Sequence, residues 1–346
     1  MYGRGARWIG VVAILLVGAR EAPADAVRSP SPTLTVETSL NRSAPRTFGQ
    51  PADPVTSTLS SPPPSGVSYV PAPGGSVERA SSHEASFGAI SFEEPWSWQV
   101  LPEGVIYRSY LAGAKEPRFA SAWVHDRDRG WIWDVSLGGR VGLIRYGTRD
   151  ALRPAGWQLD FEGAALPRLD LGHDRDVVAT DYRVGVPLTH GEGPFRWKFA
   201  YYHLCSHLAD EYLLRYPDAV RLNYIRDSLV LGTSYDWADD LRLYAEAAWA
   251  FNIDDGAQPW EFQFGIDYSP LRPTGFGGAP FVAVNGHLRE ELDFGGNLVF
   301  QTGWQWRGPS AHLFRAGMQY YVGKSDQFEF FDDYEEKLGL AIWYDF

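Results

Sequence analysis

The chain has 346 residues and carries 31 basic against 43 acidic side chains, for a formal charge of −12 at pH 7. This balance argues against sequence-independent binding to nucleic acid, which needs a basic surface to displace counterions, so we expect no nucleic-acid partner. The single cysteine, Cys205, excludes an intramolecular disulfide and a zinc site built from cysteine clusters. After residue 17 no apolar run approaches the roughly 20 residues that a membrane-spanning helix needs.

Residues 1–26 are typical of an export signal peptide. Arg4 and Arg7 precede an apolar stretch from Trp8 to Val17, and small residues that suit a cleavage site follow it up to Ala26. Because such a peptide directs the mature chain out of the cytoplasm, we expect an exported protein in the envelope of a diderm bacterium.

Residues 27–91 are rich in Pro, Ser, Thr and Ala and nearly free of aromatic side chains. Such a segment buries too little apolar surface to offset its ordering entropy, so the sequence predicts a disordered linker. A tether across a cell envelope is the functional alternative. Residues 92–117 differ in composition and are expected to pack on or in the domain that follows, with one strand over Val105–Leu111.

From residue 118 to the C-terminus, apolar and polar side chains alternate. Leu241 and Leu243, for example, alternate with Arg242, Tyr244 and Glu246, which places the two sets on opposite faces of a strand. Many of these segments exceed ten residues, which is long for a soluble sheet. About twelve such segments are predicted, near 118–126, 132–147, 154–166, 176–188, 194–206, 220–235, 240–252, 258–269, 279–290, 295–307, 310–322 and 337–346.

The two faces of these strands differ in a way that indicates a membrane. The apolar face is bulky and carries aromatic residues at many strand ends, whereas the other face carries Asp, Glu, Arg and Gln of both signs, as a polar lumen would. We therefore predict an all-β fold over residues 118–346, an antiparallel transmembrane β-barrel of about 12 strands. A soluble lipocalin-like barrel or β-sandwich is the alternative. The mixed signs further predict a lumen that is paired and largely filled.

An even number of strands places both ends of the barrel chain on the periplasmic side. The loops near 127–131, 167–175, 207–219, 253–257, 290–294 and 323–336 then face outward. The last strand alternates from Leu338 to a C-terminal Phe346, which resembles the signal by which the outer-membrane assembly machinery recognises its substrates. Outer-membrane lipids and this assembly machinery are accordingly the expected partners.

The densest cluster of reactive side chains lies between Tyr201 and Glu211. Strand parity places His203, Cys205 and His207 on the lipid face and turns Ser206 toward the lumen, unless a bulge shifts the register. The next strand carries two polar residues on its lipid face, and pairing across the hairpin brings His203 opposite one of them, Asn223 or Asp227. Polar groups on a lipid face cost free energy, so this cluster requires an explanation.

The spacing of this cluster resembles outer-membrane phospholipase A, a twelve-stranded barrel in which a histidine and a serine lie two residues apart on one strand and an asparagine on the next strand orients the histidine. The resemblance implies a lipid acyl hydrolase with a base, a nucleophile and an orienting group. It also implies a calcium ion held partly by acidic loop residues. In this sequence the base is His203, the nucleophile Cys205 or Ser206, the orienting group Asn223 or Asp227, and the acidic residues Asp210 and Glu211.

A second resemblance covers roughly residues 92–346. The run from His203 through Tyr212 is similar to an uncharacterised bacterial envelope family, a domain of unknown function whose members often show His-x-Ser-Ser-His followed by Gly-Asp-Glu. This resemblance implies an exported envelope protein without an established activity. In both resemblances Cys205 stands where a serine is expected. A thiol acts as a nucleophile when a neighbouring histidine lowers its pKa, but the substitution also fits lost activity.

Two other interpretations of the cluster remain open. In the first, its residues are only rim and loop residues that hydrogen-bond one another, water or lipopolysaccharide head groups. In the second, His203, His207 and Asp210 bind a metal ion, although two histidines four residues apart on a strand lie about 13 Å from each other, too far to share an ion without a bend. The class that competes with the hydrolase is a non-catalytic barrel, either structural or a narrow channel for small solutes.

Overall fold

The computed structural model describes residues 94–238, 240–254 and 256–346. The expected signal peptide and linker lie outside the described residues. Each of the twelve predicted segments contains a strand, which confirms the all-β prediction. The strands are β2 (Phe119–Asp126), β3 (Gly130–Gly147), β4 (Gly156–Asp170), β5 (Asp176–Glu192), β6 (Phe195–Leu208), β7 (Ile225–Ala238), β8 (Leu241–Asp254), β9 (Trp260–Tyr268), β10 (Ala279–Arg289), β11 (Gly295–Arg307), β12 (Leu313–Lys324) and β13 (Tyr334–Asp345).

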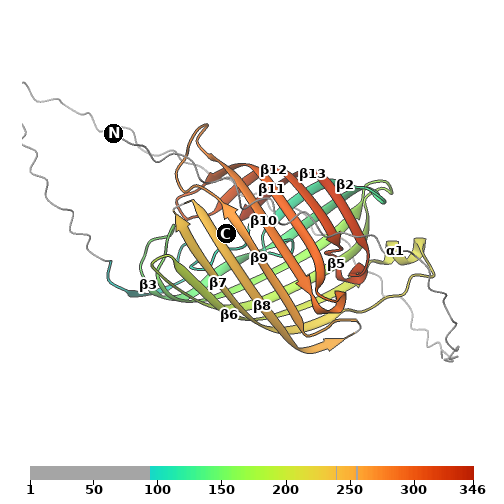
Figure 1. Cartoon of the computed structure of the whole chain (residues 1–346), viewed down its shortest axis with the longest axis horizontal. Coiled ribbons are helices and arrows are strands. Elements are labelled where there is room, and N and C mark those ends of the chain that lie inside the picture. Colours follow the sequence, from blue (N-terminus) through green and yellow to red (C-terminus); the bar gives the residue numbers. More distant parts are fainter. Residues whose placement is uncertain (1–93, 239, 255) are drawn as a thin grey trace, which may run out of the picture. The chain divides into compact units, whose positions relative to one another are not determined.

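These strands form a closed antiparallel barrel of twelve strands (Figure 1). Each strand pairs with its neighbour in sequence, and β13 closes the ring by pairing with β2, with Leu340 opposite Trp123. A short additional strand, β1 (Ser97–Val100), pairs with the end of β3 beyond the start of β2. Closure leaves no sheet edge along most of the wall, which is what a β-structure in a membrane requires.

The faces of the wall are arranged as the alternation predicts. Leu137, Phe161, Leu231, Phe264 and Leu340 point outward and are exposed. The charged residues expected inside are buried or nearly so. They are Arg140, Asp160, Glu162, Asp181, Arg183, Arg242, Glu246, Glu261, Asp267, Arg289 and Arg315. An apolar exterior around a charged interior inverts the pattern of a soluble barrel and is typical of barrels of the outer-membrane type.

Residues 101–118 enter the lumen, one of the two placements expected for this segment. The predicted strand over Val105–Leu111 is wrong, because the segment is irregular and pairs with no strand of the wall. Side chains anchor it instead: the Tyr110 ring stacks on Tyr244 at 3.9 Å between centroids, and its hydroxyl donates to Glu246 at 2.7 Å. We call residues 101–118 the lumen segment.

The arginines of the inner face satisfy the backbone of the lumen segment. Only its ends make backbone hydrogen bonds with β3, where the Leu101 N–H donates to the Leu143 carbonyl and the Arg118 carbonyl accepts from the Gly138 N–H. The carbonyls between them need other donors, because a buried carbonyl without a donor costs free energy. Arg242 donates to the carbonyls of Arg108 and Ser109, and Arg315 donates to that of Leu111. Arg145 likewise reaches two carbonyls, at Glu103 and Gly104. These inward arginines therefore have a structural purpose.

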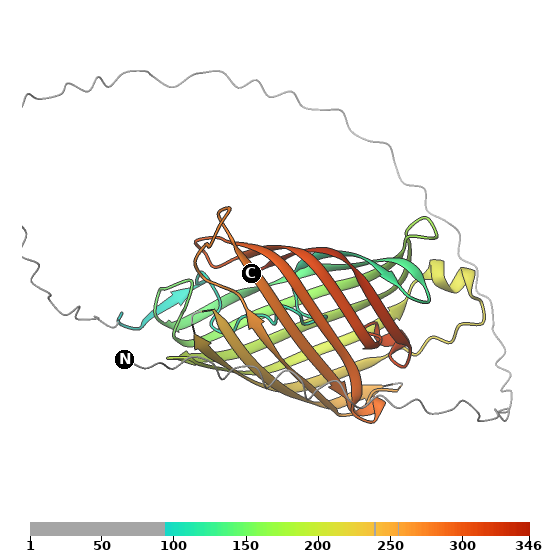
Figure 2. The same cartoon turned by 45° about the horizontal axis from the view of Figure 1, so that its top comes forward.

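The two ends of the barrel differ. One end carries the chain entry to β2 and the end of β13. The opposite end, which we call the loop end, carries the loops predicted to face outward, with helix α1 (Asp210–Arg215) and the 3₁₀ helices η1 (Glu290–Leu292) and η2 (Phe328–Phe330). Helix α1 projects beyond the wall in both views (Figures 1 and 2). No helix among the described residues has the length and apolar character needed to cross a membrane.

The lumen is closed from both sides. The lumen segment fills it from one end, and η2 folds into it from the loop end, where Phe328 is buried against Tyr224. Three cavities beside the lumen segment measure about 40, 30 and 60 Å³, room for a few water molecules each. The prediction of a paired and largely filled lumen is confirmed.

Candidate functional site

The loop end of the outer face carries a hydrogen-bonded group centred on Asp227. The register of β6 and β7 places Asp227 directly opposite His203, and His203 Nδ1 lies 2.8 Å from Asp227 Oδ1. The same oxygen accepts a bond from the Tyr201 hydroxyl at 2.7 Å, and Oδ2 accepts one from Asn252 Nδ2 at 2.7 Å. We call Tyr201, His203, Cys205, Asp227 and Asn252 the rim cluster.

A β-bulge brings Asn252 to this face. The pairing of β7 with β8 shifts between Asp227 and Ser228, so that Phe251 is an extra residue in β8. Strict alternation would turn Asn252 inward with Tyr244 and Glu246, whereas the bulge re-aims it toward Asp227. With this contact the Asp227 carboxylate accepts bonds from three side chains, which fixes its position beside the imidazole.

The pairing across the rim cluster also fixes the tautomer of His203. An ionised carboxylate only accepts hydrogen bonds, so Nδ1 carries the proton and Nε2 is left as the acceptor. Cys205 follows on the same strand and the same face, about 7 Å along it by strand rise. It is partly exposed and lies opposite Ile225 and Tyr182 in the neighbouring strands.

The other candidate residues lie apart from the rim cluster. Ser206 is fully buried in the lumen, where its hydroxyl donates to Asp181 and accepts the Glu329 backbone N–H at 3.0 Å. Asn223 lies in the loop before β7 with a φ of 55°, a left-handed conformation that Asn tolerates, and its N–H donates to Glu329. The structure thus pairs His203 with Asp227 and holds Asn223 elsewhere.

The expected metal ligands do not come together. His207 Nδ1 accepts a bond from Arg221 at 2.8 Å, while Asp210 and Glu211 are exposed in the first turn of α1. Across residues 94–238, 240–254 and 256–346, no three His, Cys, Asp or Glu side chains are arranged to hold a metal ion. Calcium takes six to eight oxygen ligands, so these residues do not fit the ion, and no step below depends on it.

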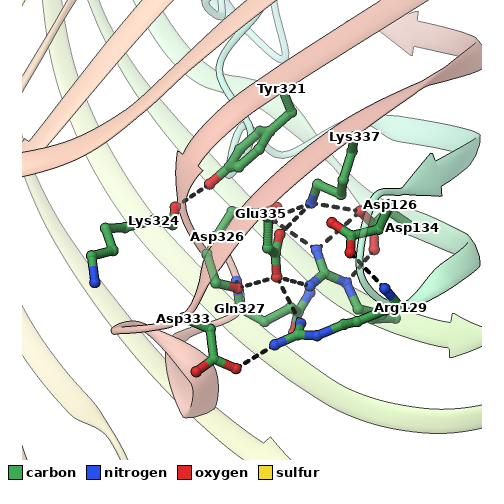
Figure 3. Close-up of polar contacts among 12 residues, drawn as sticks. Asp126, Arg129, Asp134, Tyr321, Lys324, Asp326, Gln327, Asp333, Glu335 and Lys337 are labelled. Atoms are coloured by element: carbon green, nitrogen blue, oxygen red, sulfur yellow. Dashed lines mark hydrogen bonds and ion pairs between the residues drawn. The ribbon is translucent and has the colours of Figure 1, made fainter. Parts of the chain in front are cut away.

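A second polar group joins the wall to the loop before β13 (Figure 3). Arg168 contacts Asp134 at 2.6 Å, Asp326 at 2.9 Å and Glu335 at 2.5 Å. Lys337 contacts the same three carboxylates at 3.1, 2.8 and 2.7 Å. We call these five residues the lumen network. Because Lys115 of the lumen segment also lies 3.9 Å from Asp326, the network ties together both elements that fill the lumen.

The lumen network predicts an acid-sensitive loop. Burial alone would raise the pKa of Asp326, but Lys337, Arg168 and Lys115 hold that pKa well below its ordinary value. A carboxyl whose folded pKa lies below its unfolded value of about 3.9 stabilises the fold above that pH, and this contribution is lost as the pH falls toward the folded pKa. We expect the protection of residues 325–333 against amide hydrogen exchange to fall as the pH drops below about 4, where this contribution is progressively lost.

Matched variants isolate this effect. Asp326→Asn should exchange rapidly already at pH 7 and lose most of the acid-dependent increase. Asp332, in the same loop, has a side chain that is 78% exposed, so Asp332→Asn should leave the profile unchanged. An acid response that persists in full in Asp326→Asn would assign it to another group that faces this carboxyl, such as Glu335, whose pKa is also lowered.

Two members of the rim cluster were not among the site residues predicted from the sequence. Alternation places Tyr201 on the lipid face but does not indicate a role in the site. The polar residues that follow it in the sequence are the one feature that could have indicated this role. No sequence pattern indicates Asn252, because alternation places it at an inward position and only the bulge at Phe251 turns it outward. Asp227 was one of two alternatives, which the register of β6 and β7 now resolves.

The comparisons with known proteins identify a family. A family model described as a protein of unknown function, DUF1207, matches residues 81–346. A comparison with curated proteins gave no match.

Solved barrels resemble the chain at low identity. Outer-membrane phospholipase from Salmonella typhi, a dimer with bound calcium, is 10% identical with a TM-score of 0.45, over 69% of this chain and 91% of that one. The Escherichia coli outer-membrane phospholipase A is 10% identical with a TM-score of 0.44, over 66% of this chain and 97% of that one. The KdgM porin is 9% identical with a TM-score of 0.36, over 66% of this chain and 99% of that one. At such identities the likeness concerns the fold and not an activity.

Proposed function

The chain belongs to the DUF1207 family, whose description assigns no activity, and we propose that this member is an outer-membrane acyl hydrolase that cleaves ester lipids at the rim cluster. In this proposal the barrel lies in the outer membrane of a diderm bacterium with its loop end outward, and Phe346 ends the strand that the assembly machinery recognises. The substrate is a lipid of the outer leaflet, because the rim cluster faces the bilayer near the loop end.

One observation carries the proposal: Asp227 accepts bonds from His203, Tyr201 and Asn252 at 2.7–2.8 Å. The Asp227 carboxylate accepts the proton of His203 Nδ1 in a hydrogen bond. The other ring nitrogen, Nε2, points away from Asp227 and is available as a base. A polar group of this size on a lipid-facing surface costs free energy. This cost is explained if the His203 imidazole acts as a catalytic base.

The chemistry follows from the neighbours of His203. The Cys205 thiol gives its proton to Nε2, and the sulfur forms a bond to the ester carbonyl carbon. The ester C–O bond then breaks, and the leaving alcohol takes the proton back from Nε2. Water then gives a proton to the same nitrogen and its oxygen bonds to the acyl carbon. The C–S bond breaks, the fatty acid leaves, and the Cys205 sulfur takes the proton back from Nε2. Ser206 takes no part in this scheme, because it is buried on the opposite face.

Capture of the acyl-enzyme tests the proposal. The full chain in micelles is incubated with p-nitrophenyl laurate and its intact mass is measured. We expect one lauroyl group on the protein, absent after alkylation of Cys205 with N-ethylmaleimide and absent in Cys205→Ala. Ser206→Ala should still form the adduct. An adduct that survives in Cys205→Ala, or no adduct together with no ester hydrolysis, contradicts the proposal.

A sealed structural barrel is the second candidate function, and the filled lumen favours it over a channel. Three cavities inside the barrel beside the lumen segment measure only about 30–60 Å³ each, which favours a sealed interior over a path for a solute. In planar bilayers a sealed barrel shows no conductance steps and a narrow channel does. The absence of both hydrolysis and conductance would therefore support the structural role.

A further inference from the structure

The loop end contains a second concave site, separate from the rim cluster. A cavity of about 320 Å³ lies between the outer ends of β3, β4 and β5, helix α1 and η2. We call it the outer pocket and define it by Arg129, Asp170, Asp176, Tyr212, Tyr216 and Phe330. Its volume lies at the lower end of the range for small-molecule sites, about 300–1,000 Å³. It suits a ligand of one or two sugar rings better than a lipid.

Aromatic rings form one wall of the outer pocket. The Tyr212 ring lies 4.8 Å from Tyr216 and 5.3 Å from Phe330 between centroids, and the second pair meets edge to face. The guanidinium of Arg129 lies over Phe330, 5.3 Å from the ring centroid. Such contacts hold the rings in place, so that flat apolar surfaces are presented without much loss of side-chain freedom on binding.

Charged side chains, most of them in ion pairs, form much of the remaining lining, beside the apolar Ile132, Val177 and Val178. Arg215 contacts Asp176 at 2.5 Å, and His173 Nδ1 lies 2.7 Å from Asp170. Arg129 contacts Asp333 and also Glu335, the latter at 2.9 Å (Figure 3). These pairs offer hydrogen-bond donors and acceptors at fixed positions. They leave little unbalanced charge at the surface of the pocket.

The balance of charge decides which ligand fits. Three arginines and three aspartates line the pocket, and the arginines are already engaged with carboxylates. An anion would have to displace one of those carboxylates, and a cation would have to displace an arginine or histidine. A hydroxyl group donates and accepts at once, so it can join an existing pair without breaking it. Neighbouring ring hydroxyls and an apolar ring face match this combination of groups.

From these observations we propose that the outer pocket binds a neutral saccharide of one or two rings, with the apolar face of a ring against Tyr212, Tyr216 and Phe330. The sugar comes either from a soluble disaccharide or from the end of a neutral surface polysaccharide. The proposal is independent of the hydrolase, because the outer pocket is lined by the ends of β3–β5, the region of α1 and η2, and shares no residue with the rim cluster.

Binding is tested with the full chain in lauryldimethylamine oxide, a detergent without a sugar head group. Maltose, lactose and cellobiose are titrated by calorimetry, and dextran oligosaccharides form the second arm. We expect saturable binding in at least one arm. Binding of the disaccharides alone points to a soluble source, and binding of the oligosaccharides alone points to a polysaccharide end. Glucose 6-phosphate and glucuronate should bind about tenfold more weakly than the neutral sugar of the same size.

Variants tie the signal to the pocket. Tyr212→Ala and Phe330→Ala should each raise the Kd about tenfold. Tyr216→Leu is a milder variant, because the Tyr216 side chain is already half exposed and its main aromatic contact is with Tyr212. The matched control is Phe276→Ala, an exposed phenylalanine far from the pocket at the opposite end of the barrel, which should bind as the wild type does. Failure of every neutral sugar, tighter binding of the anions, or unchanged binding in all three pocket variants would overturn the proposal.

Discussion

Replacement of His203 with alanine should lower kcat for ester hydrolysis about 10²- to 10⁴-fold, with a smaller change in KM. In the proposed mechanism the imidazole takes the proton of the Cys205 thiol in the first step and activates water in the last. Without it neither step has a base. The measurement is the steady-state rate with a micellar p-nitrophenyl ester over a range of substrate concentrations, after the variant is shown to shift its gel mobility on heating as the wild type does.

Matched variants separate this role from a general effect on the rim. Asp227→Asn keeps the size of the side chain but removes the acceptor that fixes the tautomer, so it should also lose most of the activity. His207→Ala removes a histidine on the same face of the same strand whose Nδ1 is bonded to Arg221 instead, and should keep wild-type activity. Equal loss in His207→Ala, or full activity in His203→Ala, would refute the assignment of His203 as the base.

The largest effect on stability is expected from Arg168→Met. The Arg168 side chain is 1% exposed and contacts Asp134, Asp326 and Glu335. Its removal leaves Asp134 with Lys337 alone, and leaves Asp326 and Glu335 with Lys337 and one further cation each, Lys115 at 3.9 Å and Arg129 at 2.9 Å. Loss of one partner from a buried ion pair costs about 3–5 kcal/mol. The measurement is urea unfolding of the protein in micelles, followed by the heat-modifiable band.

Two further variants show where that effect comes from. Arg127 contacts Glu336 at 3.3 Å but is 73% exposed, so Arg127→Met should cost at most about 1 kcal/mol. Adding Glu335→Leu to Arg168→Met removes one of the stranded carboxylates and should recover part of the loss. If the two arginine variants were equally stable, the lumen network would contribute no more than a surface ion pair.

The wall of the barrel could be predicted from the sequence because every strand has one apolar and one polar face. That period of two fixed the strands, their approximate ends and the side that each residue faces, as at Leu241 and Arg242. The lumen segment has no such period. Its path depends on arginines from distant strands that donate to its carbonyls, and no local pattern encodes that, which is why the strand expected over Val105–Leu111 is wrong.

The candidate site was predictable in part for the same reason. Parity placed His203 and Cys205 on one outward face, and hairpin pairing limited the partner of His203 to Asn223 or Asp227. The choice between those two depends on where β7 begins, which is set by the loop that contains α1. Asn252 depends on a single extra residue in β8, and one inserted residue reverses every parity assignment beyond it.

The lumen segment also constrains the order in which the molecule assembles. It precedes every strand of the wall in the sequence, yet Leu111 accepts a hydrogen bond from Arg315, 204 residues later, and Arg118 pairs with Asp345 in the last strand. Contacts between such distant residues form late in folding. The packing of the lumen segment is therefore not complete until β13 has paired with the wall. Closure of the barrel and final ordering of the lumen segment then occur in the same step. A nascent barrel that lacks only its last strand would still expose an arginine-lined interior.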